Sequence, residues 1–294
     1  MKLRRSLIEA LLGTLARMPL PRVHALGAAL GWLLWRIPNS QRRIAATNLA
    51  LCFPRLSAAE RRWLLRASLI ETGKTVLELG PLWLWPGERV LAQITAVEGE
   101  EDWRAALAAG RGGIAITPHL GAWEVAGLYV SRHYPITTLY RPSRHGIDEL
   151  IRHGRERLGA RTVPTDQRGV RALFQALKAG EVLGILPDQD PGPENGVFAP
   201  FFGIPAATMV LVSKLAMKQR CPVFLVVAER LPQGRGYCIR FTPLPQGIAE
   251  EPLEHSVAVL NQAVEQEVRR LPAQYLWTYK RFKSRPPGAP RRYP

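Results

Sequence analysis

The stretch GGIAITPHLGAWE, residues 112–124, holds the pattern that decides the fold. Its run 114–117 is short and mostly apolar, as expected of a buried strand. Pro118 and Gly121 then end the strand in a turn, because proline lacks the N–H of a ladder and glycine tolerates turn conformations. A helix is expected to begin near Trp123, so the stretch predicts a strand, a turn and a helix in succession.

The same alternation continues along the chain. Short apolar or β-branched runs predict strands at residues 114–117, 136–140, 182–186, 223–228 and 237–242. Helical spacing predicts helices at residues 123–131, 147–158, 169–178, 207–219 and 253–270. The fold class is therefore α/β, with a mostly parallel central sheet flanked by helices. Ligands are expected beyond the carboxyl ends of the strands.

One uncharged stretch, residues 195–213, does not fit a membrane-spanning helix. It contains Pro200, Gly203 and Pro205, which interrupt a helix. We expect a buried loop that leads into the following helix.

The N-terminal part differs from the rest, because residues 1–95 are mostly helical in pattern. The apolar segment 23–36 would span about 21 Å as a helix, which is short for a bilayer core of about 30 Å. Trp32 and Trp35 lie beside Arg36, a combination suited to the headgroup layer. We therefore expect a membrane-associating helical layer in an interfacial mode or as a single anchor. The alternative is an amphipathic helix packed on a soluble core.

These patterns divide the chain into three parts. Residues 1–38 form the membrane-associating helices, and residues 284–294 form a tail rich in Pro and Arg. Residues 39–283 form the α/β domain, helical over 39–95 and α/β over 96–283.

The charge balance restricts the possible partners. The chain has 294 residues, and 40 Lys and Arg against 24 Asp and Glu leave a net charge of +16. Such an excess favours polyanionic partners: nucleic acid, an anionic membrane, an acidic protein or a phosphorylated substrate. The apolar fraction of 47% excludes a disordered chain.

His119 and Glu124 are candidate catalytic residues. His119 follows a predicted strand, and Glu124 lies in the first turn of the next helix, so the carboxylate can reach back to the imidazole. That contact would fix the ring tautomer and leave the other nitrogen free as a general base. The alternative is a structural loop histidine, since the spacing alone arises by chance about 0.5 times in a chain with six histidines and 24 acids.

Five stretches carry a resemblance to a known family. They are NLALCFP at 48–54, TPHLGAWE at 117–124, YRPS at 140–143, ALKAGEVLGILPDQDPGPENGVFAPFFGIPAAT at 176–208 and QYLWTYKRFKSRPPG at 274–288. The sequence resembles the bacterial lipid A late acyltransferases of the lauroyl and myristoyl type, which have a glycerolipid acyltransferase-like fold.

The resemblance implies transfer of a fatty acyl group from an acyl carrier protein thioester to a hydroxyl of a Kdo-lipid A precursor. His119 would be the general base and Glu124 would orient it, with no metal and no cofactor. The partners implied are acyl carrier protein, a phosphorylated lipid A precursor and the anionic inner membrane at its cytoplasmic face, and not nucleic acid. An acceptor of another glycerolipid or glycolipid class is the alternative.

Further site residues follow from the resemblance and from the sheet edge. Arg141 ends a predicted strand and is expected to contact phosphate, although His145 stands where the family often has Asn. Arg171 is chosen from a row of downstream arginines for the same substrate. Asp188 and Asp190 follow another strand and are expected to belong to the substrate site. As an Asp-x-Asp pair they also leave open a metal-dependent glycosyltransferase.

The C-terminal stretch 275–288 mixes aromatic and basic residues, including Trp277, Phe282 and Arg281. Such a mixture can stack on nucleic-acid bases, which leaves a basic nucleic-acid-binding module as another alternative. It equally suits a membrane interface, and with Trp32 and Trp35 at the other end we favour the membrane.

Overall fold

The computed structural model describes residues 2–140, 146–192 and 195–293, and Arg141, Arg144 and His145 lie outside this part of the chain. The helices are α1 (Lys2–Ala16), α2 (Leu20–Arg36), α3 (Ser40–Cys52), α4 (Ala58–Leu84), α5 (Gly87–Leu91), α6 (Glu100–Leu107), α7 (Trp123–His133), α8 (Asp148–Glu156), α9 (Gln167–Lys178), α10 (Leu211–Gln219) and α11 (Leu253–Arg270), with 3-10 turns η1 (Pro232–Gly234), η2 (Gln246–Ala249) and η3 (Pro272–Gln274). The strands are β1 (Ile94–Glu98), β2 (Gly113–Ile116), β3 (Ile136–Tyr140), β4 (Arg161–Pro164), β5 (Val182–Ile185), β6 (Gly196–Phe201), β7 (Ile204–Met209), β8 (Val223–Arg230) and β9 (Tyr237–Pro243).

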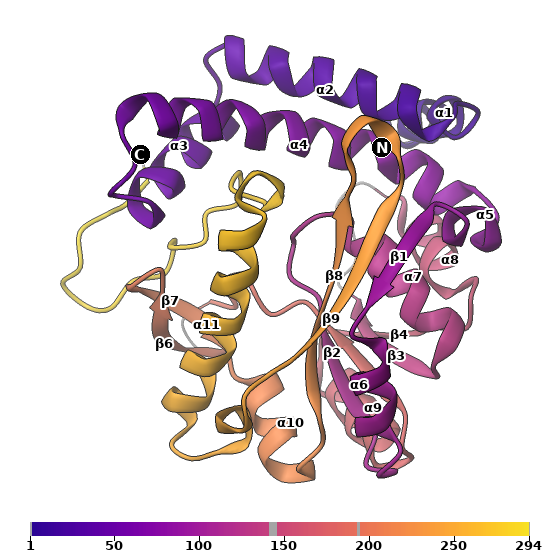
Figure 1. The fold of residues 1–294 in the computed structure, drawn as a ribbon, viewed down its shortest axis with the longest axis vertical. Helices are drawn as coiled ribbons and strands as arrows, with labels where there is room; N and C mark the ends of the chain where they lie inside the picture. The colour runs from indigo at the N-terminus through magenta and orange to yellow at the C-terminus, as the bar shows by residue number, and fades with distance from the viewer. Residues whose placement is uncertain (1, 141–145, 193–194, 294) are drawn as a thin grey trace.

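The central sheet has the strand order β1-β9-β8-β2-β5-β3-β4 (Figure 1). Neighbouring strands run parallel except for β8 and β9, which pair antiparallel as a hairpin. The expected α/β class with a mostly parallel sheet is thus confirmed. The edge strands β1 and β4 were not predicted, because their side chains are largely exposed and leave no apolar run in the sequence.

Helices cover both faces of this sheet. The side chains of Ile114 and Ile116 in β2 pack in one cluster with α9, α10 and α11. Ala115 points to the opposite face, where it packs in a second cluster with α6 and α7. This alternation along one strand places the two cores on either side of the sheet.

The stretch 195–213 is a correction to the expectation of a buried loop. It forms the antiparallel hairpin β6–β7, and α10 begins only at Leu211. Phe202 and Gly203 both have positive φ, as the two central residues of a tight hairpin turn require. Pro200 pairs with Pro205 across the hairpin. The strands were not predicted because proline lacks the N–H of a ladder and is rare within strands.

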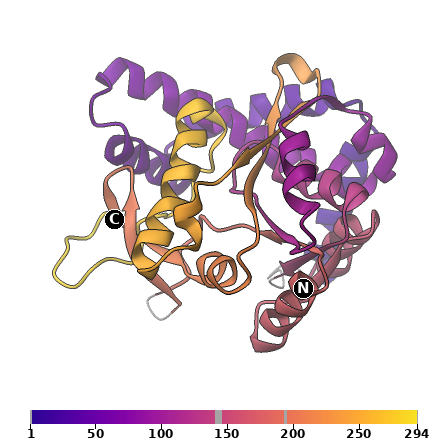
Figure 2. The ribbon, with the colours of Figure 1, turned by 60° about the horizontal axis from the view of Figure 1, so that its bottom comes forward.

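The N-terminal helices form a layer along one side of the molecule, as both Figure 1 and Figure 2 show. Helix α2 packs against α4 with backbone nearly touching backbone. A Cβ on Gly31 would lie 2.2 Å from the carbonyl oxygen of Leu69, and one on Gly27 would lie 2.5 Å from the Cα of Lys74. No helix in the described ranges combines the length and apolar character needed to cross a membrane.

A buried charged cluster ties this layer to the sheet. The Arg230 guanidinium from β8 donates to Glu78 and Glu71 of α4, and its Nε lies 2.9 Å from Glu78 Oε2. His24 of α2 reaches the same Glu78 oxygen at 3.0 Å. Arg230 also approaches the carbonyl of Gly121 at 3.4 Å, so the cluster lies directly behind the turn that follows β2.

The C-terminal aromatic residues do not face a membrane, contrary to our expectation. Trp277 and Phe282 are 2% and 1% exposed and belong to the main core cluster. The Asn48 side chain of α3 donates to the carbonyls of Trp277 and Tyr279, which fixes this segment against the helical layer. The aromatic and basic mixture therefore reflects packing.

Candidate active site

The turn between β2 and α7 presents His119 at the carboxyl edge of the sheet. Gly121 has φ of +62°, and a Cβ there would lie 2.1 Å from the carbonyl oxygen of Ala228, so only glycine fits. The Gly121 N–H donates to the carbonyl of Gln274, and the Leu276 N–H donates to the carbonyl of His119. The backbone on both sides of the imidazole is therefore fixed before any side chain acts.

Asp188 is the hydrogen-bond partner of His119. Its Oδ1 lies 2.9 Å from His119 Nδ1, and its Oδ2 accepts from the His119 backbone N–H at 3.0 Å. The two residues meet because Ile116 of β2 pairs with Ile185 of β5, and each functional residue lies three positions further along its chain. Parallel, in-register strands thus bring together residues that are 69 positions apart.

The environment of Asp188 keeps it ionised. Burial would raise the pKa of this carboxyl, but the His119 charge and its two hydrogen bonds hold the pKa below the usual range. A carboxylate only accepts hydrogen bonds, so Nδ1 of the neutral ring carries the proton and Nε2 is the basic nitrogen. Nε2 faces the side-chain Nε2 of Gln189 at 3.2 Å, consistent with an amide donor opposite a ring acceptor.

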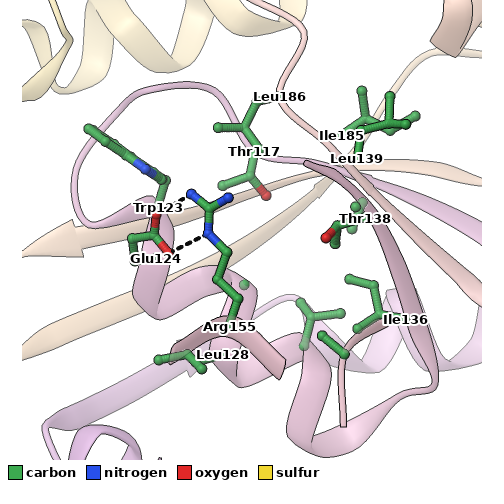
Figure 3. Close-up of a pocket in the computed structure, with 15 residues that line it drawn as sticks. Thr117, Trp123, Glu124, Leu128, Ile136, Thr138, Leu139, Arg155, Ile185 and Leu186 are labelled. Atoms are coloured by element: carbon green, nitrogen blue, oxygen red, sulfur yellow. Dashed lines mark hydrogen bonds and ion pairs between the residues drawn. The ribbon is translucent and has the colours of Figure 1, made fainter. Parts of the chain in front are cut away.

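Glu124 has a different partner from the one we expected. Both of its oxygens face Arg155 of α8, with 3.0 Å between Arg155 Nε and Glu124 Oε2 (Figure 3). The two ring nitrogens of His119 face Asp188 and Gln189, so the ring does not donate to Glu124 as we expected. The ring instead packs edge-on against Trp123, with centroids 5.0 Å apart.

The pair of Glu124 and Arg155 is charged and largely buried. Burial would raise the pKa of Glu124, but the Arg155 guanidinium outweighs it and the pKa lies below its ordinary value. A positive charge on His119 would lower the pKa of Glu124 further. Arg155 closes the pair with two parallel contacts, an arrangement that lysine cannot reproduce.

An apolar pocket lies between the sheet and helices α7 and α8, next to this site (Figure 3). It contains about 610 Å³ of space free of atoms, part of it open to solvent. Its lining residues are Ala115, Thr117, Trp123, Glu124, Gly127, Leu128, Val130, Ile136, Thr138, Leu139, Arg155, Ala160, Gly184, Ile185 and Leu186. Glu124 and Arg155 are the charged members of an otherwise mostly apolar wall, and Thr117 and Trp123 connect that wall to His119.

The other predicted site residues are dispersed. Arg141 lies outside the described residues, and Arg171 is exposed on α9. Asp190 accepts hydrogen bonds from the backbone and hydroxyl of Ser284 at 2.7 and 3.0 Å, which holds the C-terminal segment in place. Asp188 and Asp190 thus bind different parts of the protein, and across the described residues no cluster of three or more His, Cys, Asp or Glu side chains is arranged to hold a metal.

Two residues of the site were missed in the sequence. Arg155 belongs to the row of downstream arginines from which only Arg171 was chosen, and Gln189 lies between the two acids that were chosen. Helical periodicity in α8 could have indicated Arg155, because it lies one turn after the apolar Ile151, which is buried, and so on the same face of the helix. No local pattern marks Gln189.

Comparisons with known proteins agree on one family. A profile of the family described as bacterial lipid A biosynthesis acyltransferase matches residues 3–284. The lipid A biosynthesis lauroyltransferase of Escherichia coli (strain K12) is 33% identical over 279 residues, which cover 94% of this chain and 90% of that protein. The palmitoleoyltransferase of the same strain is 30% identical, covering 92% and 88%, and its myristoyltransferase is 27% identical, covering 89% and 81%.

Proposed function

Because the chain belongs to the bacterial lipid A biosynthesis acyltransferase family, we propose that it moves a lauroyl- or myristoyl-class acyl group from acyl carrier protein to a hydroxyl of a Kdo-lipid A precursor. Acyl transfer onto lipid A is the activity of this family. Our proposal further specifies the acyl donor, the acceptor hydroxyl and the catalytic residues of this chain.

His119 is the general base of this proposal. The observation that supports it is the hydrogen bond of 2.9 Å between His119 Nδ1 and the buried Asp188 carboxylate. It leaves Nε2 basic, on a ring that is 16% exposed and lies beside an apolar pocket. A base must lie within hydrogen-bond reach of the proton it takes, so the acceptor hydroxyl displaces the Gln189 amide and donates to Nε2.

The transfer itself needs no covalent enzyme intermediate. As Nε2 takes the hydroxyl proton, the alkoxide oxygen attacks the thioester carbonyl and the C–S bond breaks in the collapse of the tetrahedral adduct. The imidazolium then returns its proton to the leaving thiolate, so protons balance. Asp188 stabilises the imidazolium formed in between, acting as an orienting carboxylate.

Glu124 acts in this scheme through its charge. Arg155 holds it at the mouth of the pocket, and its carboxylate attracts the positive ring that develops on His119. Glu124 therefore keeps a catalytic role, but as an electrostatic partner beside the ring.

The apolar pocket is the place for the donor acyl chain. Its wall of aliphatic side chains suits methylene groups, and the thioester would lie near Thr117 and Trp123. We retain Arg141 and Arg171 as contacts for acceptor phosphates, since Arg141 directly follows β3 and α9 follows β4 at the same sheet edge. Asp190 acts by fixing the loop after Asp188.

We place the enzyme at the cytoplasmic face of the inner membrane, held by the helical layer. Of the ten large apolar side chains that are exposed in the described part of the chain, nine lie between Leu7 and Leu84, and Val170 is the other. An apolar surface of this kind on one layer of helices suits an interfacial position.

The test is His119→Ala in the full-length protein. We expect acyl transfer from lauroyl- and myristoyl-acyl carrier protein to fall by about 10²–10⁴-fold. His153→Ala on α8 is the matched control, because that ring is exposed and should leave activity intact. Wild-type transfer by His119→Ala at an unchanged melting temperature would refute the general-base assignment. Transfer from acyl-coenzyme A but not from the carrier protein would refute the donor.

A further inference from the structure

Three arginines converge on one tryptophan at the end of the helical layer. The guanidinium carbons of Arg36, Arg62 and Arg66 lie 5.8, 5.7 and 5.5 Å from the centroid of the Trp35 ring. Arg36 comes from α2, and the other two lie one turn apart on α4. We call these four residues the Trp35 corner.

The positive charge of this corner has no acidic counterpart. The sequence contains no Asp or Glu between Glu9 and Glu60, so α2 and α3 carry none. Glu60 accepts from the backbone of Ser57, and Glu71 is bound to Lys74 and Arg230. Among the residues that the structure describes, no salt bridge involves any of the three arginines of the corner.

Like charges held together repel each other, and the ring faces offset only part of that cost. An anion with several oxygens would neutralise the group and match the planar, forked donors of arginine, as phosphate does. Arg42 and Arg43 at the start of α3 add to the same basic end of the layer.

The surroundings identify the source of the phosphate. Exposed apolar side chains flank the corner: Trp32, Leu33, Ile37 and Trp63 are 43–67% exposed. Tryptophan and arginine side by side are typical of the headgroup level of a membrane. Along α4, Arg66 precedes Glu78 by twelve residues, about 18 Å of helix, and Glu78 belongs to the charged cluster behind the turn that carries His119.

We propose that the Trp35 corner binds the phosphate of an anionic phospholipid headgroup, as a second contact with the membrane remote from the catalytic histidine. This inference rests on the proposed membrane position of the helical layer and is independent of the acyl-transfer chemistry. Its occupant is a lipid of the bilayer and not the acceptor substrate.

The test compares vesicle binding of the full-length protein and the double variant Arg62→Gln/Arg66→Gln. We use phosphatidylcholine vesicles with and without 30% phosphatidylglycerol, at constant ionic strength. The wild type should bind the anionic vesicles more tightly, and the double variant should lose about ten- to thirtyfold on them and little on neutral ones. Lys214→Gln/Lys218→Gln on α10 has the same spacing and charge loss, and should bind like the wild type.

Further arms separate the possible failures. Arg62→Lys/Arg66→Lys keeps the positive charges but loses the paired N–H donors of the guanidinium groups. This variant should therefore bind anionic vesicles several times more weakly than the wild type. Full binding by this variant would overturn the proposed phosphate site in favour of general attraction. Equal losses on neutral vesicles would overturn it as well.

An acyl-transfer assay in detergent tests whether the corner binds the acceptor substrate. The glutamine double variant should keep the wild-type KM for the lipid A precursor, and a raised KM would assign the corner to the acceptor and refute our proposal. Absence of wild-type binding to any vesicle would refute the membrane position, and leave the chemistry at His119 untouched.

Discussion

Two buried carboxylates stand on either side of the same turn, and they are used differently. Asp188 and Glu124 are 5% and 6% exposed, and the pKa of each lies below its ordinary range because a cation or imidazole outweighs the effect of burial. Asp188 is held by an imidazole, which can exchange a proton with a substrate, whereas Glu124 is held by a permanently charged guanidinium. The difference separates a carboxylate that orients a base from one that supplies a fixed charge.

Asp188→Asn should have the largest effect. The Asn amide has one oxygen, so it can accept from either Nδ1 or the backbone N–H of His119. The ring then loses the hydrogen bond that fixes its tautomer, or the backbone loses the one that holds the turn. We expect kcat for acyl transfer to fall by about 10²–10⁴-fold with a smaller change in KM. Steady-state kinetics with saturating donor measure this, and Asp166→Asn at the N-terminus of α9 is a control for loss of a structural carboxylate. A loss below tenfold would show that Asp188 does not orient the base.

Glu124→Gln should have the next largest effect and act on stability as well. The amide removes the charge beside His119 and leaves the Arg155 guanidinium without its counter-ion. Because Arg155 remains 31% exposed, we expect a cost of about 1–3 kcal/mol in the free energy of unfolding, below that of a fully buried pair. Transfer should fall by about 10²-fold, and denaturant melts beside kinetics separate the two effects. If Glu124→Gln lowers the free energy of unfolding without altering kcat, the residue is structural only.

The stretch around His119 was predictable because its signals are local. A strand of apolar residues, Pro118 and Gly121 in a turn, and a helix start at Trp123 specify the edge of the sheet on which the imidazole lies. The strands and helices around it followed from the same local patterns. His119, Glu124 and Asp188 were named from the sequence and lie together at this edge, whereas Arg155 and Gln189 were not named.

The pairing of the carboxylates could not be predicted in the same way. Which acid reaches His119 depends on β2 and β5 being neighbours in register, and on Arg155 of α8 forming an ion pair with Glu124. Strand order and the position of α8 are set by the packing of the whole core. Spacing along the chain suggested Glu124, five residues away, while the partner with the hydrogen bond is 69 residues away.

Acid stability provides a finer test of the two pairs. A carboxyl whose pKa is lower in the folded than in the unfolded state stabilises the fold above the unfolded value, and this contribution is lost as pH falls. The loss should begin near pH 4.5 for Glu124 and near pH 3.8 for Asp188, the ordinary values of the two carboxyls, and continue below them. Glu124→Gln and Asp188→Asn should each flatten the fall in unfolding free energy, by up to about 1.4 kcal/mol per pH unit. Urea melts between pH 2.5 and 6 give the slopes, and a wild-type slope in either variant contradicts the assigned shift.

Gly184→Ala should have the smallest effect and reports on the apolar end of the pocket. Gly184 lies on β5 in the pocket wall, where a Cβ would come within 2.6 Å of Thr138 Cγ2 and 3.0 Å of Ile136 Cδ1. Either these side chains move into the pocket or the strand shifts, and both leave less room for the terminal carbons of an acyl chain. We expect a several-fold change in preference toward the shorter donor when lauroyl- and myristoyl-acyl carrier protein compete, read by mass spectrometry of the product. Gly13→Ala on α1 is the control, since a Cβ there meets no atom within 4 Å. A loss of activity equal for both donors would show that the pocket does not select the chain, although the Glu124–Arg155 pair in its wall would keep its role.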